Sequence, residues 1–110
     1  MLFKPQMIEA IEARRKTVTR RPFGLKMPYR VGRTYAIQPG RGKLHVGHIT
    51  ILSKIEEPLL YLTQLEAQRE GFDSPMAFYV AWREMYGAVD PGASVWRLFF
   101  EYVGREECCH

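Results

Sequence analysis

Apolar residues at helical spacing predict a helix near the start of the chain. Met7, Ile8 and Ile11 fall on one face of such a helix, and Pro5 suits its first turn, where the missing amide hydrogen has no intrahelical partner to lose. We therefore expect a helix over residues 5–15.

The following segments have the character of strands. The Thr-Val-Thr run at 17–19 favours extended structure, and residues 34–38 and 43–53 are two further strand candidates joined by a turn at 39–42. Within 43–53 the apolar positions change from even to odd numbers at Gly47, which predicts a β-bulge near that glycine. Because a bulge bends a strand, a sheet that curls into a small barrel is expected.

Two helices are expected in the second half of the chain. Thr63 and Glu66 have the spacing of a capping box, and Gly71 suits the end of a two-turn helix. Residues 73–75, Asp-Ser-Pro, begin another helix, which stops at Gly87. An apolar stripe on this helix is expected to be core rather than a ligand surface, and it consists of Phe78, Trp82 and Met85.

A final strand is expected over residues 95–103, with one face made by Trp96, Leu98, Phe100 and Tyr102. The order of helix, strands, two helices and strand indicates an α+β fold. With 110 residues, of which 46% are hydrophobic and 25% charged, the chain is expected to form one domain over residues 1–110 around a single core.

The net charge of +4 hides a strong segregation of charge. Up to Ile55 there are twelve basic residues against two acidic ones, and beyond it four basic against ten acidic. Residues 13–55 contain no acidic residue at all. These cations must face either the acidic half of the same domain or an anionic partner such as nucleic acid, and the sequence leaves both possibilities open.

Other classes of protein and site are not expected. No apolar run is long enough to span a membrane, and adjacent Cys108 and Cys109 beside His110 suit a reducing compartment, so a cytoplasmic protein is expected. His45 and His48 would point to opposite faces of a strand, and a glycine loop for phosphates is missing from the sequence. We therefore expect no metal site and no cofactor.

The basic run at 14–22 is either a solvated turn or a functional site. Lys16 stands among four arginines, and like charges disfavour its protonated form, which makes a lysine usable as a base near neutral pH. A neighbouring hydroxyl is then a plausible nucleophile. The four arginines are Arg14, Arg15, Arg20 and Arg21.

Glu70 lies at the expected end of a helix, where the helix dipole disfavours an anion, and Glu66 one turn earlier adds repulsion. One interpretation is an exposed and tolerated acid. The other is an acid held by a cation from the basic half. On helix electrostatics, Glu70→Gln would leave the melting temperature unchanged or raise it, and in the second case it would also lower activity.

Five segments together resemble the ASCH domain of the PUA-like superfamily. The resemblance covers nearly the whole chain and is most specific at the Arg-Lys-Thr-x-Thr-Arg run. It implies a small mixed β-barrel flanked by helices, with a cleft associated with RNA or modified nucleosides. The segments are 7–11, 15–20, 29–32, 46–49 and 95–98.

Small bacterial ASCH proteins similar to this chain are amidohydrolases that remove the acetyl group from N4-acetylcytidine with a Lys, Thr and Glu set. The resemblance carries these roles onto Lys16 as general base, Thr19 as nucleophile and Glu70 as the acid that orients Lys16 or water. In a regular strand Lys16 and Thr19 would face opposite ways, so Lys16 must lie in the turn before the strand. Those amidohydrolases usually have a glycine where this chain has Arg14.

The resemblance also implies an alternative, a noncatalytic RNA-binding module or a ribonuclease. The expected partner is thus a modified nucleoside or single-stranded RNA. Tyr29 and Tyr35 are the candidates for base stacking, and a guanidinium or backbone amide at Arg20 or Arg21 is the candidate oxyanion donor. The expected substrate-binding or RNA-binding residues are Arg15, Arg20, Arg21, Tyr29, Arg30 and Tyr35.

Overall fold

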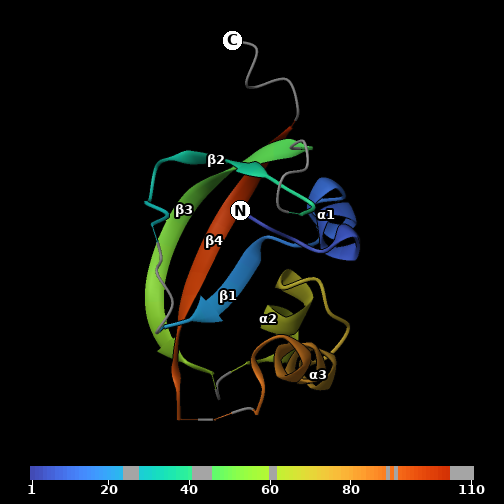
Figure 1. Ribbon diagram of the computed structural model, residues 1–110, viewed down its shortest axis with the longest axis vertical. Coiled ribbons are helices and arrows are strands. Elements are labelled where there is room, and N and C mark those ends of the chain that lie inside the picture. The colour runs from blue at the N-terminus through green and yellow to red at the C-terminus, as the bar shows by residue number, and fades with distance from the viewer. Residues whose placement is uncertain (24–27, 41–45, 60–61, 89, 91, 105–110) are drawn as a thin grey trace.

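The computed structural model describes residues 1–23, 28–40, 46–59, 62–88, 90 and 92–104 (Figure 1). Three helices and four strands occur in the order predicted from the apolar pattern, with boundaries shifted by a few residues. The elements are α1 (Pro5–Glu12), β1 (Val18–Pro22), β2 (Thr34–Ile37), β3 (Gly47–Pro58), α2 (Gln64–Arg69), α3 (Pro75–Tyr86) and β4 (Ser94–Gly104). The α+β class is confirmed.

The strands form one antiparallel sheet in the order β1-β4-β3-β2, and the three helices lie on the same side of it in Figure 1. The described strands do not close into the expected small barrel, because β1 and β2 remain the two edges of the sheet. Leu2 instead makes a parallel bridge to Gln38, just beyond the end of β2. The segment before α1 thus lies along this edge, in the place where β1 would have to pair to close the sheet.

The predicted bulge near Gly47 is confirmed. The register between β3 and β4 shifts between His48 and Ile49, and it shifts again between Ile51 and Ser53. Each shift changes which residues of β3 face the helices, and the sheet bends there.

The buried apolar side chains fall into two clusters rather than the single expected core. One cluster joins α1 to the sheet and includes Ile11, Ile51 and Phe100, whereas the other lies at α2 and α3 and includes Phe78 and Trp82. Where β1 meets α2, the buried side chains are charged instead of apolar: Lys16, Arg20 and Glu70.

One detail of the predicted core is wrong. Met85 is 47% exposed, because it faces outward from the last turn of α3, while Phe78 and Trp82 are buried as expected. Trp96 belongs to neither cluster and stacks on Phe23, with ring centroids 4.7 Å apart. Leu98 and Phe100 of the same strand do belong to the first cluster.

Some expectations concern residues outside the described part of the chain. These are the end of the turn at 39–42, the placement of His45, and the segment of Cys108, Cys109 and His110. Among the described helices, none combines the length and the apolar character that crossing a bilayer requires.

Candidate functional site

A tight turn after α1 places Lys16 ahead of β1, as the resemblance required. The amide of Arg15 donates to Ala10 O at 2.9 Å, and Arg14 between helix and turn has a φ of 63°. This left-handed backbone is the conformation that glycine adopts most easily at the end of a helix. Arginine therefore adopts at position 14 a backbone conformation that favours glycine.

Backbone hydrogen bonds fix the turn against two other elements. The amide of Thr17 donates to Arg69 O of α2 at 2.8 Å, and Phe100 N of β4 donates to Thr17 O at 2.9 Å. Lys16 is therefore held between α2 and the sheet.

The Lys16 side chain is buried and fully hydrogen-bonded. Its Nζ donates to the main-chain oxygens of Val18 and Glu70, each at 2.8 Å, and to Glu70 Oε1 at 3.0 Å. Three acceptors match the three hydrogens of an ammonium group. Glu70 is thus held by a cation of the basic half, and the interpretation of an exposed acid is wrong.

The end of α2 brings Glu70 into this position. Thr63 caps the helix by accepting from the Glu66 amide at 3.1 Å, which confirms the predicted start. Gly71, with a φ of 93°, ends it, and a Cβ built on Gly71 would lie 3.5 Å from the Cβ of Lys16. That distance is an ordinary contact, so the positive φ, and not the space, is what favours glycine at position 71.

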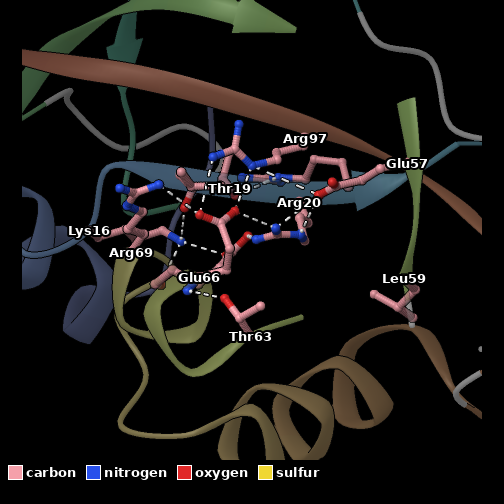
Figure 2. A network of polar contacts seen from close by, with 12 residues as sticks. Lys16, Thr19, Arg20, Glu57, Leu59, Thr63, Glu66, Arg69 and Arg97 are labelled. Atoms are coloured by element: carbon pink, nitrogen blue, oxygen red, sulfur yellow. Dashed lines mark hydrogen bonds and ion pairs between the residues drawn. The ribbon is translucent and has the colours of Figure 1, made fainter. Parts of the chain in front are cut away.

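Arg20 connects three acidic residues of the second half in one network (Figure 2). Its Nη1 donates to Glu70 Oε2 at 3.0 Å, and its Nη2 donates to Glu66 Oε1 at 2.6 Å and to Glu57 Oε1 at 2.9 Å. Arg97 adds a bond from Nε to Glu66 Oε1 at 2.7 Å. The expected repulsion between Glu66 and Glu70 is therefore offset by cations that both carboxylates share.

Burial and these ion pairs shift three pKa values. Burial lowers the pKa of Lys16, with Arg21 and Arg20 acting in the same direction and Glu70 opposing them. Burial also opposes the charge of Arg20, but its carboxylate partners outweigh burial and raise its pKa. For Glu66, burial is outweighed by the hydrogen bonds from Arg97 and Arg20, which lower its pKa to about 2.

A cavity of about 420 Å³ opens beside this network. Its lining includes Lys16, Thr19 and Glu70, whose exposed fractions are 3%, 4% and 2%. Arg21 lies at the same wall, with its Nε 3.4 Å from Thr19 Oγ1 and its guanidinium 5.2 Å from the centroid of the Phe3 ring. The aromatic part of the lining comes from Phe3, Phe72, Phe78, Trp82 and Tyr86.

The structure divides the other residues expected to bind substrate or RNA. Arg15 is exposed and does not line the cavity, and Arg20 lines it while its guanidinium bonds to carboxylates. Tyr29 and Tyr35 pack on each other with ring centroids 4.8 Å apart, and Arg30 N donates to Tyr35 Oη at 2.7 Å. These last three residues form a separate group outside the cavity lining.

Sequence reasoning missed the acidic partners of Arg20 and the aromatic wall of the cavity. Glu66 carried signals only for helix capping and for repulsion with Glu70. Glu57 and Arg97 carried none, because their meeting with Arg20 depends on the pairing of β3 and β1 with β4. Trp82 was assigned to the core, and it both belongs to a core cluster and lines the cavity. Within the described residues, no group of three His, Cys, Asp or Glu side chains could hold a metal ion.

No family model matches the sequence, and neither does any curated protein. Solved structures do match. The ASCH domain of Lactobacillus crispatus has a TM-score of 0.77 at 17% identity, with 90% of this chain and 71% of that chain covered. A DUF984 protein of Enterococcus faecalis has a TM-score of 0.69 at 19% identity, with the same coverage.

The ASCH protein of Zymomonas mobilis has a TM-score of 0.64 at 17% identity, and the match covers 93% of this chain and 67% of that one. All three matched proteins are longer than this chain. Each match covers nine-tenths of this chain or more. The chain therefore has the fold of ASCH domain proteins, as the resemblance in its sequence predicts.

Proposed function

We propose that this chain is an amidohydrolase that removes the acyl group from N4-acylated cytidines such as N4-acetylcytidine. The observation that carries the proposal is the buried Lys16–Glu70 pair at the wall of a cavity that Thr19 also lines. A basic group, a hydroxyl and a carboxylate at one wall are the set that acyl transfer to a hydroxyl needs.

Lys16 is the general base of the proposed reaction. Its neutral amine takes the proton of the Thr19 hydroxyl while Thr19 Oγ1 forms a bond to the acyl carbon. The tetrahedral oxyanion then collapses, the bond to the cytosine amino nitrogen breaks, and the Lys16 ammonium gives its proton to that nitrogen. Water hydrolyses the acyl-threonine ester with Lys16 again as base, which releases the carboxylic acid.

Burial supports this role, since it lowers the pKa of Lys16 and thereby increases the fraction of neutral amine at a given pH. A neutral lysine retains two hydrogens for two of its three present acceptors, and its lone pair becomes available for the Thr19 proton. This step requires one of the present hydrogen bonds of Lys16 Nζ to be given up.

Arg21 is the oxyanion donor of the proposal. Its Nε lies 3.4 Å from Thr19 Oγ1, so its guanidinium is adjacent to the oxygen that bonds to the acyl carbon in the tetrahedral intermediate. The sequence offered Arg20 and Arg21 equally for this role. The carboxylate bonds of Arg20 favour Arg21, whose removal would be expected to slow the reaction by about 10²–10³-fold.

The size and lining of the cavity fit the substrate class. A volume of about 420 Å³ falls in the range of about 300–1,000 Å³ typical of small-molecule pockets. Aromatic side chains such as Phe72 and Trp82 suit the flat face of a pyrimidine.

The experiment is incubation of the chain with N4-acetylcytidine, with release of cytidine and acetate measured by chromatography. Thr19→Ala should reduce turnover to background, and rapid acid quenching of the native chain should trap an acetyl ester on Thr19. Turnover no greater than that of Thr19→Ala would disprove the proposal. Arg15→Gln is the matched control, because Arg15 belongs to the same basic run but lies outside the cavity lining.

Single-stranded RNA is the alternative partner, and the protein would then act as a binding module or ribonuclease. Its support is the acid-free basic stretch at 13–55. The packing of Tyr29 against Tyr35 weakens the stacking role expected for both rings. RNA affinity that falls steeply with salt, without hydrolysis of the nucleoside, would favour this alternative. The cytoplasmic location stays a prediction.

A further inference from the structure

We propose that Arg20 is a positioning residue of the cavity, which holds the Glu70 carboxylate through Oε2 and remains its counter-ion when Lys16 is neutral. This inference rests on the proposed function, in which Lys16 must lose a proton before it can accept the one from Thr19. Arg20 acts through Glu70 and Lys16 and does not itself touch the reacting atoms in this scheme.

The two carboxylate oxygens of Glu70 accept from different cations. Oε1 accepts from Lys16 Nζ and Oε2 accepts from Arg20 Nη1, both at 3.0 Å. The Glu70 side chain is 3% exposed, so water cannot replace either cation easily. If Lys16 were its only partner, loss of the Lys16 proton would leave a buried carboxylate without a counter-ion.

Arg20 is itself fixed by anions other than Glu70. Nε and Nη2 both donate to Glu57 Oε1, at 3.1 and 2.9 Å, and Nη2 also donates to Glu66 Oε1. Its charge persists throughout the pH range in which a lysine titrates, because a guanidinium does not lose its proton in proteins. Arg20 therefore neutralises Glu70 in both protonation states of Lys16.

The proton balance follows from this arrangement. Lys16 releases one proton to solvent base to reach the reactive form, and the Glu70–Arg20 pair is unchanged in charge. During attack the Thr19 proton moves to Lys16, and the positive charge that reappears on Nζ faces Glu70 Oε1 again. The charged groups that act on Lys16 in the described structure are Glu70 from the end of α2 and Arg20 and Arg21 from β1.

The experiment measures the titration of Lys16 directly, by the pH dependence of its 13Cε chemical shift in protein labelled on lysine. The Lys16 signal is assigned as the one lost in Lys16→Met. Arg20→Gln removes a like charge near Lys16 and leaves Glu70 to pair with Lys16 alone, so the Lys16 midpoint should rise by about one pH unit or more. Arg20→Lys should give a smaller rise, because it keeps a positive charge beside Glu70.

The pH dependence of the kinetics is a second measurement, and it would not change if Arg20 had a structural role alone. For N4-acetylcytidine, the acid limb of kcat/KM in Arg20→Gln should shift upward by the same interval. At pH values below the Lys16 midpoint, kcat/KM of Arg20→Gln would then be about tenfold lower than that of the native chain, and it would recover at higher pH.

Arg69→Gln is the matched control, since Arg69 pairs with Glu66 in the same network, has a side chain that is 43% exposed, and forms no side-chain ion pair with Glu70 in the described structure. It should leave the Lys16 midpoint unchanged. An unchanged midpoint in Arg20→Gln, or an equal rise in Arg69→Gln, would overturn the inference. If Arg20→Gln does not fold, Arg20→Gln/Glu66→Gln removes a cation and an anion together, and the same rise is expected.

The two proposals fail in different ways. A native chain that leaves N4-acetylcytidine intact but shows the shifted Lys16 titration in Arg20→Gln would disprove the proposed reaction and support the counter-ion role. A native chain that hydrolyses the substrate, with the Lys16 midpoint indifferent to Arg20, would do the opposite.

Discussion

The ammonium of Lys16 and the carboxylate of Glu70 meet at 3.0 Å, and each side chain is only 3% exposed. The pair joins the turn before β1 to the end of α2, two parts of the chain separated by 54 positions. The helix C-terminus destabilises the Glu70 carboxylate by a fraction of a kcal/mol, whereas a buried charge without a partner destabilises the fold by several kcal/mol. The burial of Glu70, rather than the helix dipole, therefore determines how much its charge contributes to stability.

Glu70→Gln should destabilise the protein, contrary to the expectation from helix electrostatics alone. The substitution leaves Lys16 and Arg20 buried against a neutral amide, and breaking a buried pair costs about 3–5 kcal/mol. Thermal unfolding should therefore show a melting temperature lower by more than about 10 °C. Glu84→Gln, at an exposed residue that lines the same cavity, should change it little. An unchanged melting temperature for Glu70→Gln would contradict the burial argument.

Arg14 offers a test of backbone strain. Its φ of 63° favours glycine, but its guanidinium also donates to Tyr102 O at 3.1 Å. Arg14→Gly and Arg14→Ala both lose that contact, so the difference between them reports the backbone alone. Urea unfolding should show Arg14→Gly to be more stable than Arg14→Ala by about 1 kcal/mol. Equal stabilities would mean that the left-handed turn is not kept in solution.

Local signals in the sequence predicted local structure well. The capping pair at Thr63, the stop at Gly71 and the phase change at Gly47 each act within a few residues of chain, and each is present in the structure. The placement of Lys16 before the strand followed from the ASCH resemblance combined with a local constraint, the alternation of side chains along a strand.

Long-range features could not be predicted in the same way. Arg20 was expected to contact a substrate or an oxyanion, because nothing in its neighbourhood says that Glu57, Glu66 and Glu70 will surround it. That arrangement depends on which strand lies beside which and on how α2 packs on the sheet. The segregation of charge left two outcomes open, and for Arg20 the structure shows pairing with the acidic half.

Acid should weaken the fold through Glu66. Its folded pKa is about 2 against an ordinary value of 4.5, so the folded state binds fewer protons than the unfolded state between these values. Glu66 thus contributes stability above about pH 4.5 that is lost progressively as the pH falls toward 2. The urea-unfolding free energy of Glu66→Gln should be lower at neutral pH and should fall less steeply in this window. Glu9→Gln, at an exposed residue of α1, should keep the native slope.

Gly47 and Tyr102 should be energetically coupled. A Cβ built on Gly47 would lie 2.9 Å from Cε1 and 3.3 Å from Oη of Tyr102, closer than packed atoms allow. Gly47→Ala should therefore destabilise the protein by about 1–3 kcal/mol, because the ring must move out of its place against the first core cluster.

A double-mutant cycle identifies the ring as the cause. In a Tyr102→Leu background the atoms that clash are absent, so the cost of Gly47→Ala in urea unfolding should fall by about 1 kcal/mol or more. Gly92→Ala is the control, since its nearest neighbour is Asp90 Oδ1 at 3.6 Å, an ordinary contact, and its cost should be the same in both backgrounds. If Gly47→Ala costs as much without the tyrosine ring as with it, the glycine serves the bulge in β3 and not the close approach of β4.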